Sequence, residues 1–356
     1  MRIFDTVTIV IPSYKPDDKL MSTLRNIVDT GFTDIIVVDD GGGEKYAPIF
    51  DAVKLIPECT VLHHEVNRGK GAALKTAFAY YIENRPDSIG LVTADADGQH
   101  LSADILRCAE VMAESESIVL GVRDFSQEHV PPRSKAGNRF TTGFFKVFFG
   151  KKISDTQTGL RAIPRKYVTP ISEVKGDRYE YETHMLFLIS KAKMPLSEQV
   201  IDTVYIDDNS SSHFRVVRDS LRIYKTVLTF ALISIISTFI EIVSITAQNS
   251  ILPDSAVKIS FFALAVVYAR ILSGIINYLL NRSFIFDKDG GFASFFKYLA
   301  VLIPIFAVTA GAAYILDILS APIWLAWFVK IVISIILFPL SFRLQHNFVF
   351  NKTTRK

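Results

Sequence analysis

Short apolar runs rich in β-branched residues alternate with helical patterns through the first 122 residues of the chain. Five such runs are expected to be strands: Thr6–Ile11, Ile35–Val38, Thr60–His64, Ile89–Thr93 and Ile118–Val122. Helices are expected between them, one beginning after Asp18 and ending at Gly31, and others at Tyr46–Ile56, Lys70–Asn84 and Ser102–Glu114. This alternation predicts a Rossmann-like α/β domain whose mostly parallel sheet is covered by helices on both faces.

Polar residues follow the predicted strands at their carboxyl ends. They are Tyr14, Asp39-Asp40, Asn67–Lys70, Asp95 with Asp97, and Arg123. In open parallel sheets, ligands bind beyond the carboxyl ends of the strands. One edge of the sheet therefore gathers carboxylates, a lysine and arginines, a combination that favours a site for a nucleotide diphosphate and a metal ion.

Asp95 and Asp97 are one residue apart directly after a strand, so both carboxylates can point to the same place. With the Gln99 amide nearby, these oxygen ligands suit Mg²⁺ or Mn²⁺, which usually takes further ligands from water and substrate phosphates. The alternative is an ordinary surface turn, in which Asp, Gly and Gln are common residues.

Two other nucleotide-binding motifs are excluded by the spacing of the glycines. A dinucleotide-binding fingerprint requires G-x-G-x-x-G after the first strand, but Pro12 follows that strand and the Gly69-Lys70-Gly71 segment has Leu74 at the third glycine position. A P-loop requires a glycine five residues before the Gly-Lys pair, and that position is His64.

The composition of the chain changes after Ser220. Only 12 of the 39 Lys and Arg residues and 5 of the 36 Asp and Glu residues follow it, within a sequence dominated by apolar residues. The length of 356 residues also suggests two domains. Because the first part is slightly acidic, no nucleic-acid partner is expected. The two cysteines, Cys59 and Cys108, are interpreted as buried thiols in a reducing cytosol.

The second part predicts an all-α domain of four transmembrane helices at residues 226–356. Each span approaches the ~20 residues needed for a crossing: Thr226–Ala247, Ile259–Leu280, Tyr298–Leu316 and Pro322–Phe342. Residues 213–225 have the pattern of an amphipathic helix at the membrane surface, which leaves residues 1–212 as the catalytic domain. Basic residues gather after the second and fourth spans, which places both termini and the catalytic domain in the cytoplasm. The expected location is the plasma membrane.

Several motifs in the first part resemble family 2 glycosyltransferases. They are Pro12-Ser13-Tyr14, Val37–Gly41, Asn67–Ala73 and Asp95–His100. Two later motifs, Asp155–Arg161 and Tyr179–His184, are similar to the dolichyl- or polyprenyl-phosphate sugar synthase branch, and the resemblance spans about residues 5–225. It implies a GT-A-type catalytic domain that uses a nucleotide-diphosphate sugar.

The resemblance also implies roles for individual residues. The donor site would comprise Pro12, Tyr14, Val38 and Asp40 at the base and ribose, Lys70 at the diphosphate, Arg123 at the sugar phosphate, and Asp95. The metal would be held by Asp95, Asp97 and Gln99. Catalysis is assigned to Asp97, Arg123 and Arg133.

The acceptor in this branch is a lipid monophosphate that is already ionised, so cations that position it matter more than a strong general base. Arg133, Ser134, Arg139 and His213 are the candidate acceptor-phosphate residues. A solvated basic helix is the structural alternative for the first three. Mannose synthases of the branch usually place an arginine where this chain has Val130, which favours a UDP-glucose-like donor and undecaprenyl phosphate, with GDP-mannose as the alternative.

The membrane part contains an internal repeat and resembles a second family. Asn281–Lys288 parallels Gln345–Lys352. Arg270, Asn277–Arg282 and the terminal Phe348-Val349-Phe350 resemble the GtrA-like four-helix family, which is associated with flipping or anchoring polyprenyl-phosphate sugars. The expected protein is thus a metal-dependent, inverting hexosyltransferase at the cytoplasmic membrane face. A flippase for lipid-linked sugars, with the soluble domain as an accessory, is the rival, and oligomeric state stays open.

Overall fold

The structure is a computed structural model that describes residues 3–127, 130, 132–150, 152–202, 227–240, 271–283, 292–319 and 322–350. The chain divides into two compact units, Met1–Ile223 and Tyr224–Lys356, which are considered separately. The predicted amphipathic helix at 213–225 and His213 lie outside the described residues.

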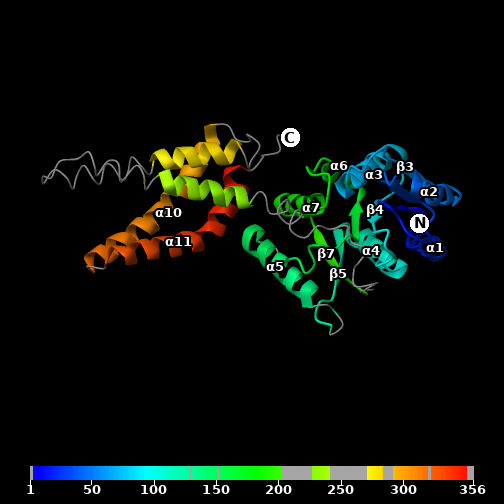
Figure 1. Ribbon diagram of the computed structural model, residues 1–356, viewed down its shortest axis with the longest axis horizontal. Coiled ribbons are helices and arrows are strands. Elements are labelled where there is room, and N and C mark those ends of the chain that lie inside the picture. Colours follow the sequence, from blue (N-terminus) through cyan, green and yellow to red (C-terminus); the bar gives the residue numbers. More distant parts are fainter. Residues whose placement is uncertain are drawn as a thin grey trace. The chain divides into compact units, whose positions relative to one another are not determined.

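The first unit is built on a seven-stranded sheet with the order β3-β2-β1-β4-β6-β5-β7 (Figure 1). The strands are β1 Val7–Ser13, β2 Ile35–Asp39, β3 Cys59–His63, β4 Gly90–Thr93, β5 Ile118–Arg123, β6 Arg161–Pro164 and β7 Leu196–Ile201. Strand β1 is parallel to both of its neighbours, β2 and β4, which places their carboxyl ends at one edge. The expected α/β architecture with a mostly parallel sheet is confirmed for this unit.

Strand β6 interrupts the parallel sheet. It is antiparallel to both neighbours, with Thr93 of β4 opposite Arg161, and Leu120 of β5 opposite the same residue. Because β6 runs in reverse, its first residue lies at the edge where β4 ends. The segment that enters β6 therefore reaches the same edge as the segments that leave the parallel strands.

Helices cover both faces of the sheet. They are α1 Lys19–Thr30, α2 Ala47–Lys54 after the 3₁₀ turn Glu44–Tyr46, α3 Lys70–Asn84, α4 Ser102–Ser115, α5 Pro132–Phe149, α6 Arg165–Ser172 and α7 Glu180–Lys191. Apolar residues of α1 and α4 share one buried core with β1, β2 and β4. Helix α3 contacts β1 and β2 from the other face, where it also contacts α6 and α7 (Figure 1).

Two glycines set helix ends that the site depends on. Gly31 ends α1 with a left-handed φ of 117°, and its N–H bonds back to Ile27 and Val28, as the sequence predicts. Gly69 precedes α3 with a φ of 105°. A Cβ on Gly69 would lie 2.4 Å from the backbone oxygen of Asp177, so only glycine allows the 177–178 segment to approach the start of α3.

The described part of the second unit is helical, at 227–240, 271–283, α10 Phe292–Ile318 and α11 Ile323–Leu344, with a π-helical turn at Gln345–Val349. The two repeat segments meet at equivalent residues, since the Asn281 amide donates a hydrogen bond to Gln345 Oε1 at 3.1 Å. Among the described residues, no helix has the combination of length and apolar character needed to cross a membrane. The four-span prediction is not confirmed, and the GtrA-like resemblance stays a prediction.

Candidate active site

Asp95 and Asp97 lie at the carboxyl edge of the sheet, just after β4. The backbone N–H of Asp95 donates to His100 Nδ1 at 3.1 Å, and the backbone N–H of Gln99 donates to Asp97 Oδ1 at 3.1 Å. These bonds close the Asp95–His100 segment into a compact loop. Burial lowers the pKa of His100, which keeps the ring neutral and able to accept that N–H.

Gly159, which precedes β6, lies against the Asp95 carboxylate. A Cβ at this position would lie 2.4 Å from Asp95 Oδ2. The Gly159 carbonyl also accepts a hydrogen bond from Thr93 Oγ1 at 2.7 Å. The absence of a side chain at Gly159 thus leaves the room that the carboxylate occupies.

Lys70, the first residue of α3, joins two carboxylates at this edge. Its Nζ lies 2.7 Å from Asp95 Oδ1 and 3.0 Å from Glu182 Oε1. Burial disfavours the charged form of Lys70, but Asp95 and Glu182 outweigh it and raise the pKa of Lys70. Burial likewise opposes ionisation of Asp95, yet the positive charges of Lys70 and Arg123 lower the pKa of Asp95 to about 2. Both groups are therefore charged at neutral pH.

The pKa of Asp97 is shifted in the opposite direction from that of Asp95. Burial, followed by the nearby charge of Asp95, raises the pKa of Asp97. A cation between the two carboxylates would relieve this repulsion. Within the described part of the chain, no cluster of three or more His, Cys, Asp or Glu side chains could hold a metal alone. The Asp95 and Asp97 carboxylates in this loop fit a Mg²⁺ or Mn²⁺ ion that takes its remaining ligands from phosphate and water.

Arg123 ends β5 and forms a two-pronged ion pair with Asp155. Its Nε donates to Asp155 Oδ2 at 2.7 Å and one terminal nitrogen donates to Oδ1 at 3.1 Å, while the Asp155 carboxylate has no exposed surface. Asp155 also accepts the Gln157 backbone N–H at 3.0 Å. Arg123, Gln157 and Asp95 line one cleft, so the pair places the guanidinium on the same side of the sheet edge as Asp95.

The predicted base and ribose residues lie at the other end of this edge. Pro12 of β1 is in register with Val38 of β2, and Tyr14 follows β1, where the Lys15 ammonium lies 5.1 Å from the centre of its ring. Asp40 is only 2% exposed. Its carboxylate accepts four hydrogen bonds, from His64 Nδ1, Asn67 Nδ2 and the backbone N–H groups of Arg68 and Gly69. These bonds fix the turn that leads into α3.

Three of the four predicted acceptor residues lie on α5. Ser134 is half-buried and Arg139 is exposed. Arg133 lies in the first turn of the helix, and its side chain is outside the described part of the chain. His213 is outside the described residues altogether. Apolar residues are also exposed on this helix: Phe140 at 63% and Val147 at 44%. Helix α5 thus presents basic and apolar side chains to the surface together.

Several residues of the site were not given a role from the sequence. They are His100, Asp155, Gly159, Arg161 and Glu182. All of them except His100 lie in the two late motifs, Asp155–Arg161 and Tyr179–His184, whose resemblance was the available signal. Their exact contacts depend on the reversed strand β6 and on α7, neither of which was predicted.

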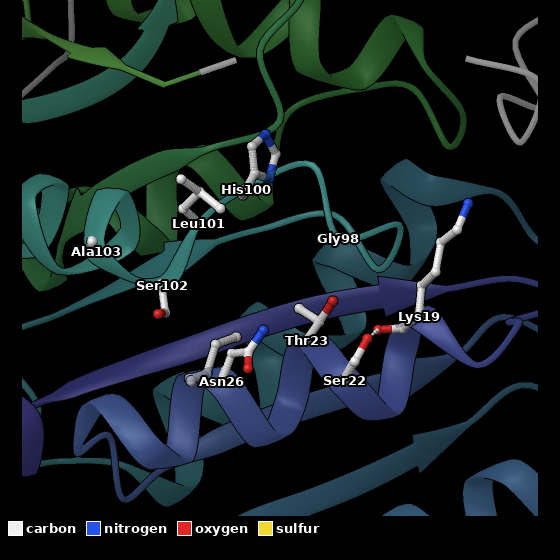
Figure 2. A pocket seen from close by; sticks show the side chains of 10 residues that line it. Lys19, Ser22, Thr23, Asn26, Gly98, His100, Leu101, Ser102 and Ala103 are labelled. Carbon is white, nitrogen blue, oxygen red and sulfur yellow. Dashed lines mark hydrogen bonds between the residues drawn. The ribbon is translucent and has the colours of Figure 1, made fainter. Parts of the chain in front are cut away.

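A larger cavity, of about 370 Å³, lies between α1 and the 98–103 segment. Figure 2 shows Lys19, Ser22, Thr23 and Asn26 on the α1 side, and His100, Leu101 and Ser102 on the segment across the cavity. His100 lines this cavity and also the cleft that contains Asp95. Neither Asp95 nor Asp97 lines this cavity, and Lys70 does not line it either.

Comparison with known proteins shows what the first unit is similar to. Residues 8–169 match the family described as Glycosyl transferase family 2. The chain is 26% identical to UDP-N-acetylglucosamine–dolichyl-phosphate N-acetylglucosaminyltransferase of Methanococcus voltae, over 56% of this chain and 86% of that protein. It is also 26% identical to dolichyl-phosphate beta-glucosyltransferase of Dictyostelium discoideum, over 61% of this chain and 73% of that protein.

Among solved structures, glucosyl-3-phosphoglycerate synthase from Mycobacterium tuberculosis in complex with Mn²⁺, uridine diphosphate and phosphoglyceric acid matches with a TM-score of 0.41 and 15% identity. The match covers 58% of this chain and 73% of that one. Residues 8–169 resemble family 2 glycosyltransferases, and the protein is a hexosyltransferase.

Proposed function

We propose that this enzyme transfers a hexose from a nucleotide-diphosphate sugar to a polyprenyl phosphate, with inversion at the anomeric carbon. The observation that carries the proposal is the placement of the Lys70 ammonium 2.7 Å from Asp95, with Asp97 following in the same loop. A lysine and two carboxylates at one sheet edge suit a diphosphate bridged by a divalent cation. A UDP-glucose-like donor is favoured, with GDP-mannose as the alternative.

The donor side follows from these contacts. Asp95, Asp97 and Gln99 would hold Mg²⁺ or Mn²⁺, which neutralises the charge that develops on the departing nucleoside diphosphate. Lys70 supplies a second positive charge at the diphosphate. Pro12, Tyr14, Val38 and the turn fixed by Asp40 line the nucleotide side, and Arg123 faces the sugar phosphate.

The acceptor side is assigned to α5. A lipid monophosphate needs cations for its headgroup and an apolar surface for its chain. The exposed Arg139 and the nearby exposed Phe140 and Val147 on this helix support that assignment. Arg133, Ser134 and His213 are proposed to complete the phosphate site. The two relatives whose names include dolichyl phosphate support a polyprenyl-type acceptor.

We further propose that residues 226–356 form a GtrA-like membrane domain of four helices, with the catalytic domain and both termini in the cytoplasm of a plasma-membrane protein. The apolar side chains exposed on α10 and α11 support contact with lipid: Ile303, Val308, Ile315, Phe328, Ile331, Ile335 and Ile336. The domain would bring the catalytic unit to the membrane that contains the acceptor.

The test is a transfer assay with the full chain in detergent and a panel of UDP- and GDP-sugars. Undecaprenyl and dolichyl phosphates serve as acceptors, with Mn²⁺ or Mg²⁺ added and lipid products measured by mass spectrometry. One sugar should give a lipid-phosphate sugar, and Asp97→Ala should give none. A protein that only flips lipid-linked sugars forms no product in detergent, and that result would contradict the proposal.

A further inference from the structure

The Lys70 ammonium is shared between carboxylates from two distant parts of the chain. Asp95 belongs to the loop after β4, and Glu182 lies in the first turn of α7. The three side chains are largely buried, with exposed fractions of 18% for Lys70, 31% for Asp95 and 11% for Glu182. The protein therefore provides two competing anions for one cation, and only one of them is also a proposed metal ligand.

Glu182 is held rigidly above the start of α3. The buried Arg161 donates from Nη1 to the Glu182 carbonyl at 2.7 Å and from Nε to the Thr158 carbonyl at 3.0 Å. On the neighbouring turn, a Cβ on Gly71 would lie 2.5 Å from the Cβ of Tyr181, so α7 touches α3 closely here. These contacts fix the backbone from which the Glu182 side chain reaches Lys70.

Lys70 and a divalent cation both require Asp95. An ammonium 2.7 Å from Oδ1 repels a second cation at the same carboxylate, so metal binding favours a shift of Lys70 toward another anion. Glu182, whose Oε1 lies 3.0 Å from Nζ, is such an anion. Without it, Lys70 would depend on Asp95 alone and would compete with the metal.

We propose that Glu182 is a positioning residue that draws Lys70 away from Asp95, so that Asp95 can bind the metal while Lys70 stays beside the donor diphosphate. This inference rests on the proposed metal and nucleotide-sugar site. Glu182 acts through Lys70 and touches neither the metal nor the reacting atoms.

The decisive variant is Glu182→Asp, which keeps the negative charge but shortens the side chain by one methylene. Its long-range attraction for a cation is nearly unchanged, whereas the 3.0 Å contact with Lys70 is lost. We expect Mn²⁺ binding to the full chain, measured by electron paramagnetic resonance without nucleotide sugar, to weaken about tenfold, the scale of one charged hydrogen bond. The KM for the nucleotide sugar should rise as well.

Two further variants separate positioning from a general effect. Lys70→Met should bind Mn²⁺ several-fold more tightly, because the competitor for Asp95 is gone, although it should lose affinity for the nucleotide sugar. In the Lys70→Met background, Glu182→Asp should change Mn²⁺ affinity by less than about twofold, since the two residues act as one unit. Glu180→Asp is the matched control, because Glu180 lies in the same turn and contacts the backbone N–H groups of Asp177 and Arg178.

The outcomes are distinguishable. Any one of three results would overturn the positioning role. Glu182→Asp could lose the same factor of Mn²⁺ affinity in both backgrounds, or Glu180→Asp could lose as much Mn²⁺ affinity as Glu182→Asp. The third such result is weaker Mn²⁺ binding by Lys70→Met than by the unaltered protein. The last variant keeps the test valid if Glu182→Asp fails to fold. If Asp97→Ala binds Mn²⁺ as well as the unaltered protein, the proposed metal site fails, and this inference fails with it.

Discussion

The Asp40 carboxylate accepts the backbone N–H of Gly69 at 2.8 Å, directly before Lys70. With three further donors on the same carboxylate, this bond ties the end of β2 to the start of α3. The position of Lys70 is thus set by Asp40, a residue that directly follows another strand.

Replacing Asp40 should therefore affect both stability and activity. Asp40→Ala leaves buried donors without a partner, and we expect a loss of about 3 kcal/mol in unfolding free energy and a fall in kcat/KM. Thermal unfolding and a transfer assay measure the two effects. Asp51→Ala, which removes an exposed ion pair with Lys54, should change stability by less than about 0.5 kcal/mol. Equal stability of the two variants would contradict the role given to Asp40.

Asp97→Ala should abolish most activity without unfolding the domain. Asp97 lies in the loop after β4 and not in the hydrophobic core, so the melting temperature should stay nearly constant. We expect turnover to fall by at least about 10²-fold, as when one preorganised electrostatic group is removed. Steady-state kinetics with and without EDTA test this. Near-normal transfer by the variant in excess EDTA would exclude the metal role.

Gly159→Ala should disturb the proposed metal site because the added methyl group would collide with the Asp95 carboxylate. The new Cβ would lie 2.4 Å from Asp95 Oδ2 and must displace the carboxylate, so we expect at least about a tenfold loss of Mn²⁺ affinity. Gly143→Ala on α5 is the control, because a Cβ there has no atom within 4 Å. Calorimetric titration with Mn²⁺ compares the two variants. Unchanged affinity in Gly159→Ala would mean that Asp95 does not need its present position.

The two cysteines should resist alkylation in the folded protein. Burial raises the pKa of Cys59 and of Cys108 to about 12. At pH 8 the reactive thiolate is then about 10⁻⁴ of each thiol, whereas an ordinary thiol is partly ionised at this pH. Iodoacetamide labelling followed by mass spectrometry should show slow modification before unfolding in urea and fast modification after it. Fast labelling of the native protein would contradict the raised pKa values.

The sequence predicts the first part of the sheet well because each strand there is an apolar run that ends in polar residues. Helix α3 at Lys70–Asn84 agrees with its predicted bounds, and β2 differs by one residue, Asp39. The predicted edge brings together Lys70, Asp95 and Arg123, as expected. These features are local, so periodicity and stop signals suffice to locate them.

Strand β6 could not be predicted in the same way. Its four residues, Arg161–Pro164, begin with an arginine and contain a proline, so they lack the composition of a central strand. Asp155 and Gly159 precede this strand, so the polar residues after the predicted strands gave no sign of them. Nor does the sequence reveal that protein groups already surround the Asp40 carboxylate, because its partners follow 24 to 29 residues later.

The close approach of the 177–182 segment to α3 has a consequence for the order of synthesis. Lys75 and Asp177 pair at 2.9 Å across 102 residues of sequence, and the Ala72 N–H bonds to the Asp177 carbonyl at 2.9 Å. A nascent chain that has left the ribosome only as far as β6 carries Asp95, Asp97 and Lys70 but lacks Glu182. The proposed donor site is therefore completed only when α7 has emerged, after Asp95 and Asp97 have already left the ribosome.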